Sequence, residues 1–267
     1  MLKDITLGQF FPGNTVVHRL DPRTKLILVV VYIVTLFSAK SFLTYGIVLV
    51  ALIGIVAASK IKPMTIIKSL KPLLFIICLT GLLNLFYTPG EPLVQFWVLT
   101  ITKEGILSAL FMVLRITMLI AGTFMLTYTT SPIALTDGLE RLLNPLKKIK
   151  VPVHELSMMM CIALRFIPTL IEETDKIMSA QKARGADFET GSLLSRAKAL
   201  IPILVPLFIS SFRRADELAV AMECRCYHGG DGRTRLKQLQ YAGRDYVALT
   251  GGVIIMAAVI VLARFGL

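Results

Sequence analysis

The sequence has few acidic residues, and long stretches of it carry no charge at all. Of its 267 residues only 17 are Asp or Glu, against 29 Lys or Arg. Four uncharged runs approach the roughly 20 residues that cross a bilayer, namely residues 41–59, 72–90, 116–136 and 246–263. With 55% hydrophobic residues and a mean hydropathy of +0.73, the composition excludes an ordinary soluble domain and indicates an integral membrane protein.

Several motifs that would define an enzyme or a pump are also missing. The chain has no Gly-x-x-x-x-Gly-Lys-Ser/Thr phosphate loop, so we expect it not to bind ATP in the usual way. Its three histidines form no His-Glu-x-x-His motif, and its four cysteines form no disulfide framework. The start of the chain, polar up to Arg23, has no pattern of a cleaved leader. We therefore expect a non-catalytic membrane subunit that needs no cofactor or metal and draws energy from a partner.

The distribution of Lys and Arg predicts the orientation in the membrane. Four lie in residues 1–25, four in 59–71 and seventeen in 129–245, with one each at Lys40 and in 88–104. Because cytoplasmic loops are enriched in these residues, we expect a cytoplasmic N-terminus and about four spans within residues 1–128. Residues 129–245 would be cytoplasmic, and a last span in 246–267 would leave the C-terminus outside. The net charge of +12 then reflects topology and anionic lipid, not nucleic acid.

Three features of the membrane region carry further expectations. Asp21-Pro22 is typical of an N-cap followed by a first-turn proline, so the first membrane helix should start there. Its apolar part, Leu26–Ala39, is short and should pair with the next run as a hairpin. The aromatic segment Leu93–Thr102 is expected at the membrane interface. Arg115 lies inside an apolar run with no obvious acidic partner in the spans, so it is functional, or it pairs with backbone carbonyls or extends its charge to the membrane interface.

Residues 153–230 contain two amphipathic helical patterns, each of which ends at an arginine. The first has an apolar stripe of Leu156, Met159, Met160, Ala163, Ile167, Leu170, Ile171 and Met178. Charged residues opposite this stripe argue against a span and favour the interface. The two tips read Ala183-Arg184-Gly185 and Cys224-Arg225-Cys226-Tyr227. Gly185 and Gly229 stand where C-caps would fall, so each arginine should project from a helix end.

Four motifs, taken in order, resemble the signatures of a known family. They are Asp21-Pro22-Arg23-Thr24-Lys25, Arg165-Phe166-Ile167-Pro168-Thr169, Ala180-Gln181-Lys182-Ala183-Arg184-Gly185 and Ala221-Met222-Glu223-Cys224-Arg225-Cys226-Tyr227. The chain resembles, over essentially its whole length, the T component of energy-coupling factor (ECF) transporters, usually called EcfT. This is the membrane scaffold of bacterial importers of vitamins and other micronutrients.

The resemblance implies an all-α integral membrane protein of the bacterial cell membrane. It implies about five transmembrane helices and cytoplasmic amphipathic coupling helices, two of them long and crossing. The tips at Arg184 and Arg225 would dock into two ATP-binding-cassette ATPases (EcfA and EcfA′-like). The apolar stripe from Leu156 to Met178 would hold a substrate-binding S component, with several S components able to exchange. At the second tip Cys224 and Cys226 flank the arginine, where the family motif is often Ala-Arg-Gly. We therefore expect Gly229 to replace the missing glycine as the cap of that helix.

Two alternatives stay open on the sequence alone. A secondary transporter would show paired broken spans in two related halves, and no such repeat is visible. A membrane-embedded enzyme could use a metal at Cys224-x-Cys226-x-His228, although a single cluster without a second Cys/His group is a weak zinc signal. Co-purification with ATPase subunits would separate the scaffold from both.

Overall fold

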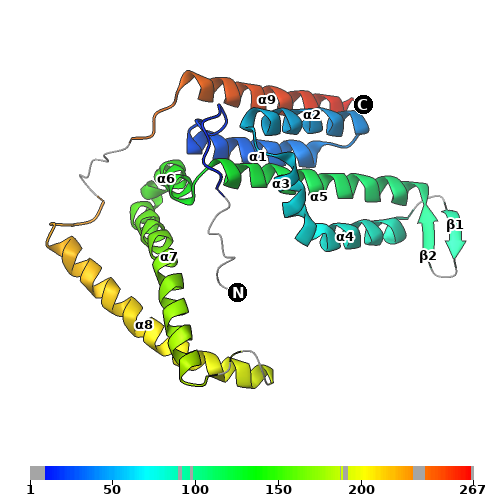
Figure 1. The fold of residues 1–267 in the computed structure, drawn as a ribbon. Coiled ribbons are helices and arrows are strands. Elements are labelled where there is room, and N and C mark those ends of the chain that lie inside the picture. Colours follow the sequence, from blue (N-terminus) through cyan, green and yellow to red (C-terminus); the bar gives the residue numbers. More distant parts are fainter. Residues whose placement is uncertain are drawn as a thin grey trace. The chain divides into compact units, whose positions relative to one another are not determined.

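The part of the chain that the structure describes folds into helices and one small β-hairpin (Figure 1). The computed structural model describes residues 10–89, 92–96, 99–186, 188, 192–230 and 238–265. These divide into two compact units, one of Gly8–Gly138 with Leu239–Leu267 and the other chiefly of Leu139–Gln238. Five of the described helices are long and apolar enough to cross a bilayer. The predicted class of a helical membrane protein is therefore confirmed.

The first two helices, α1 (Pro22–Ser38) and α2 (Phe42–Ser59), begin at side-chain caps. The predicted start of α1 is confirmed, because the Asp21 carboxylate accepts a hydrogen bond from the Arg23 backbone N–H at 2.9 Å. Ser41 caps α2 reciprocally with Thr44: the Thr44 hydroxyl accepts from the Ser41 N–H at 3.0 Å, and the Ser41 hydroxyl accepts from the Thr44 N–H. The starts of both helices are thus fixed by local hydrogen bonds.

The unit formed by Gly8–Gly138 and Leu239–Leu267 is called the membrane unit below. Its longest described helix, α5 (Lys103–Thr129), packs antiparallel to the segment formed by α3 (Pro63–Leu70), η2 (Lys71–Leu73) and α4 (Leu74–Tyr87). Near one end the hydroxyl groups of Ser69 and Tyr128 share a hydrogen bond. Further along, a Cβ at Gly81 would lie 2.9 Å from Val113, so only glycine lets the two helices approach this closely.

The connection between α4 and α5 is a β-hairpin and not only an interfacial segment. Strands β1 (Pro92–Phe96) and β2 (Leu99–Thr102) pair antiparallel, with Gln95 opposite Thr100. Thr102 then becomes the N-cap of α5, because its hydroxyl accepts from the Gly105 N–H at 2.9 Å.

The remaining elements are α6 (Pro132–Leu143), η3 (Asn144–Ile149), α7 (Val153–Ala183), α8 (Leu193–Glu223) and α9 (Gly243–Arg264). By length and hydropathy the candidate spans are α2, α3 with α4, α5, α7 and α9. Because α7 is one of these candidate spans, the prediction that its charged face excludes a transmembrane span is corrected. Most of its charges follow Arg165, so an 18-residue window of this helix carries at most two. The predicted first span, α1, has 17 residues and is not among the candidates.

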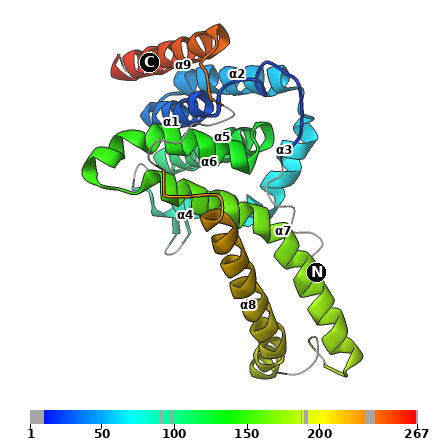
Figure 2. The ribbon, with the colours of Figure 1, turned by 90° about the vertical axis from the view of Figure 1, so that its left-hand side faces the viewer.

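Within the membrane unit, α9 returns to lie beside α1 and α2 (Figure 2). The side chains of Leu36, Val48 and Val259 are fully buried at the centre of this packing. By contrast, Val50 on α2 and Phe75 on α4 are 70% and 73% exposed. Apolar side chains on the outside of a helical bundle are suited to hydrocarbon, as expected for a protein that lies in a bilayer.

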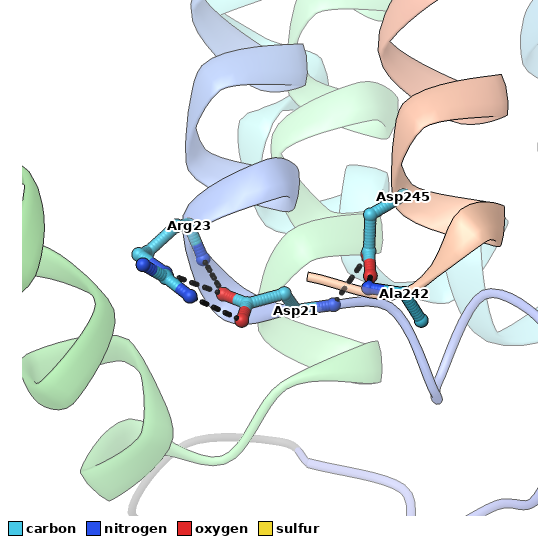
Figure 3. A network of polar contacts seen from close by, with 4 residues as sticks. All are labelled: Asp21, Arg23, Ala242 and Asp245. Carbon is cyan, nitrogen blue, oxygen red and sulfur yellow. Dashed lines mark hydrogen bonds and ion pairs between the residues drawn. The ribbon is translucent and has the colours of Figure 1, made fainter. Parts of the chain in front are cut away.

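A polar network joins the starts of α1 and α9 (Figure 3). Asp245 is 1% exposed, and its two carboxylate oxygens accept from the backbone N–H groups of Asp21 and Ala242, each at 2.8 Å. Asp21 in turn pairs with the Arg23 guanidinium at 3.0 Å, and that guanidinium lies 4.0 Å from the centre of the Tyr241 ring. Two segments more than 200 residues apart are therefore held by charge-assisted hydrogen bonds.

Lys25, just before the apolar run that begins at Leu26, ties the same end of the unit to α5. It is 5% exposed, and its Nζ donates to the carbonyl of Thr129 at 2.8 Å, the hydroxyl of Thr130 at 3.0 Å and the carbonyl of His18 at 3.3 Å. All three of its protons are used, which explains how a lysine can be buried here.

Arg115 is held by the α1–α2 hairpin. Its Nε donates to the Tyr45 hydroxyl at 2.8 Å and its Nη2 to the Ala39 carbonyl at 3.4 Å, while the rings of Phe37 and Tyr45 lie within 6 Å. This arrangement favours the second reading of Arg115, in which backbone and aromatic groups satisfy the charge and the residue links α5 to the hairpin.

Candidate functional site

Arg184 occupies the C-cap position of α7, directly after Ala183. Beyond it Gly185 has φ of +86°, and its N–H donates to the Lys182 carbonyl at 3.0 Å. The Ala186 N–H donates back to the Gln181 carbonyl, also at 3.0 Å. This pair of bonds is the Schellman motif, which closes a helix with a residue in the left-handed conformation. The glycine cap predicted at Gly185 is confirmed.

The end of α8 is closed in the same way, but by a cysteine. Cys226 has φ of +55°, and its N–H donates to the Glu223 carbonyl at 2.8 Å, while the Tyr227 N–H donates to the Met222 carbonyl at 3.1 Å. Arg225 thus occupies the position that Arg184 holds in α7. The prediction that Gly229 closes this helix is wrong: Gly229 also has positive φ, at +96°, but lies beyond the cap. Sequence reasoning expected glycine there, whereas the backbone bonds impose the same turn on Cys226.

Both arginines are exposed, and so are the neighbours Ala183, Gly185, Cys224 and Cys226, while Tyr227 is half-buried. Within the described part of the chain neither guanidinium makes a hydrogen bond or an ion pair. A cation at a helix C-terminus is favoured by the helix dipole, so each arginine can be held there without a partner of its own. Each tip therefore offers five unsatisfied donors in a rigid planar group.

The apolar stripe of α7 is most open in its first half. Leu156, Met159, Met160 and Ala163 are exposed, with Met159 at 55%. Ile167, Leu170, Ile171 and Met178 are half-buried. The second amphipathic pattern predicted from the sequence also carries an apolar stripe, although none of its apolar residues was assigned to partner binding. In the structure α8 has exposed apolar side chains at Leu200, Ile201, Leu204, Val205, Phe208, Ile209 and Phe212.

The two arginine-tipped helices contact each other in antiparallel directions. Glu173 of α7 meets Ser210 and Arg214 of α8, and the Gln181 side chain donates to the Pro202 carbonyl at 3.5 Å. That carbonyl is free because Pro206, four residues later, has no N–H to donate.

The geometry gives no support to the alternative of a metal site. Cys224, Cys226 and His228 are all exposed, and no cluster of three or more potential ligands occurs among the residues that the structure describes. The arrangement is suited instead to recognition, with two guanidinium tips and an adjoining apolar surface.

The left-handed cap at Cys226 predicts opposite effects for one substitution at two nearby positions. Cys226→Gly should slow amide hydrogen exchange in the last turn of α8 by about two- to fivefold, because glycine adopts positive φ without the steric cost of a Cβ. Cys224→Gly should speed that exchange by a similar factor, because Cys224 is helical and donates to the Val220 carbonyl at 2.9 Å. Exchange mass spectrometry on the purified chain measures both, and equal signs at the two positions would refute this account of the cap.

Comparisons with known proteins identify the family of the chain. The family described as CbiQ, cobalt transport protein, matches residues 13–236. Three relatives are each named energy-coupling factor transporter transmembrane protein EcfT. The Clostridium kluyveri protein is 56% identical over 93% of each chain. The Acidaminococcus fermentans protein is 54% identical over 99% of this chain and 97% of its own, and the Bacillus subtilis protein 46% identical over 99% and 100%. The resemblance seen in the four motifs is confirmed, and the chain belongs to the CbiQ family of cobalt transport proteins.

Proposed function

We propose that this protein is the scaffold of an ECF transporter, in which it couples two ATP-binding-cassette ATPases to an S component that binds a vitamin or another micronutrient. The observation that carries the proposal is the matched pair of tips, since Arg184 and Arg225 occupy the same position in the same capping motif. Membership of a transporter family whose relatives are named EcfT supports it.

The tips are suited to docking because they combine charge with fixed geometry. A guanidinium pairs with a carboxylate through two parallel hydrogen bonds, which set orientation as well as affinity. The chain has no phosphate loop of its own, so hydrolysis would occur in the partners and the tips would receive the resulting movement. In this mechanism the subunit is not itself an enzyme.

The S component would occupy the apolar stripe of α7. Its exposed first half includes Met159 and Met160, and flexible thioether side chains repack at little cost. A surface of this kind can accept several partners of different shape, so S components could exchange on one scaffold. The substrate would then be chosen by the S component.

For the orientation we propose a cytoplasmic N-terminus, cytoplasmic tips and an outside C-terminus. The proposal rests on the seventeen Lys and Arg residues between residues 129 and 245 and requires that α7 lie along the interface. If α7 spanned the bilayer, as its length and hydropathy would allow, both tips would lie on the opposite side, because α8 is not among the candidate spans.

Docking is tested by truncating the arginines. Arg184→Ala and Arg225→Ala should each weaken pull-down of the ATPase pair and reduce uptake, because the loss leaves a carboxylate desolvated and unpaired at a cost of about 2 to 5 kcal/mol. Lys should rescue poorly, since it keeps the charge without the planar fork. Arg165→Ala is the matched control, as Arg165 is an exposed arginine on the flank of α7. Normal pull-down and uptake in the double Ala variant would disprove the proposal.

Orientation is tested with the exposed Cys224 and Cys226 in a variant that lacks Cys78 and Cys161. A membrane-impermeant maleimide should label this variant in inverted vesicles and leave it unlabelled in intact cells, because the tips would face the cytoplasm. Labelling in intact cells would show instead that α7 crosses the bilayer.

A further inference from the structure

One carboxylate joins the two helices that carry the arginine tips. Glu173 of α7 accepts a hydrogen bond from the Ser210 hydroxyl through one oxygen, and its other oxygen pairs with Arg214 Nη2 at 2.9 Å. Ser210 and Arg214 are four residues apart and so lie on one face of α8. Two donors on successive turns fix the rotation of α8 about its own axis as well as its distance from α7.

The surroundings hold this contact in place. The Glu173 and Arg214 side chains are 21% and 38% exposed, and Arg214 Nε is enclosed with no acceptor among the described residues. A guanidinium that is packed in this way depends on Glu173 for its charge pairing. The other polar contact, between Gln181 and the Pro202 carbonyl, is a neutral hydrogen bond at 3.5 Å and therefore weaker.

The position of the contact relates it to both tips. Glu173 precedes Arg184 by eleven residues, and Arg214 precedes Arg225 by eleven residues, about 16 Å of α-helix in each case. Neither intervening segment contains proline or glycine, so both are continuous helix. The helix prolines Pro168, Pro202 and Pro206 all lie on the N-terminal side of the contact in their own helix. Each tip is therefore connected to the contact by an uninterrupted helical arm.

We propose that Glu173, Ser210 and Arg214 form a clamp that fixes the crossing of α7 and α8, so that movement received at one arginine tip is transmitted to the other. Glu173 and Arg214 are positioning residues in this scheme, which rests on the proposed function of the tips. Without the clamp, ATP would still be hydrolysed by docked partners, but less of the movement would reach the surface that seats the S component.

The first measurement is made on the full chain without partners. Spin labels at Cys224 and at Ala183→Cys, with the other three cysteines replaced, report the distance between the tips. Glu173→Gln and Arg214→Gln should broaden the distance distribution, whereas Glu172→Gln and Arg213→Gln should not. The control residues are the exposed neighbours of the clamp and make no hydrogen bond or ion pair within the described residues.

The second measurement is made on the reconstituted transporter. The same clamp variants should lower uptake per ATP hydrolysed by about two- to fivefold, a size typical of a partly exposed ion pair, with ATPase pull-down unchanged. The charge-exchanged double variant Glu173→Arg, Arg214→Glu should recover a narrow distribution and most of the coupling. The clamp is refuted if its Gln variants behave like the neighbouring controls, or if charge exchange restores nothing. Since the distance measurement needs no ATPase, its outcome is independent of whether the arginines dock.

Discussion

The last carbonyl groups of a helix need hydrogen-bond donors from beyond the helix. The way in which α7 and α8 meet this requirement determines where Arg184 and Arg225 stand. In both helices the two residues after the arginine turn their N–H groups back onto the final turn. The arginine then stands at the C-cap position, directly before the left-handed residue, exposed and without a partner within the described chain. Since the constraint is one of backbone hydrogen bonding, it can be met by Gly185 in one helix and by Cys226 in the other, at a different conformational cost.

The membrane unit solves a related problem with charged side chains. Asp245 and Lys25 are almost completely buried, and each is satisfied largely by backbone groups, including at least one from a distant segment. In a low-dielectric environment such bonds are strong and costly to break, so they hold the starts of α1 and α9 and the end of α5 together. The Asp-Pro-Arg-Thr-Lys motif thereby acquires a structural explanation, as the segment that joins three helices at one end.

The sequence predicted those features of the fold that depend on neighbouring residues, such as helix caps. The cap at Asp21 and the glycine at Gly185 could both be predicted, because each depends on residues within one turn. The partners of Arg115 and the pairing of Glu173 with Arg214 could not, because they join residues 41 to 76 positions apart. The cap at Cys226 was missed for another reason: propensity favours glycine at positive φ, and the surrounding hydrogen bonds overrode it. Hydropathy also proved ambiguous for α7, whose charges are unevenly distributed along its length.

The central claim is that each arginine tip enters an ATPase subunit, and site-specific cross-linking tests it most directly. A photoreactive amino acid placed at Ala183 or at Cys224 lies beside one arginine and leaves both arginines intact. In the assembled transporter, each position should cross-link to an ATPase subunit, while the same probe at Met159, on the apolar stripe, should cross-link to the S component. Cross-links from both tips to lipid or to the S component alone would contradict the account.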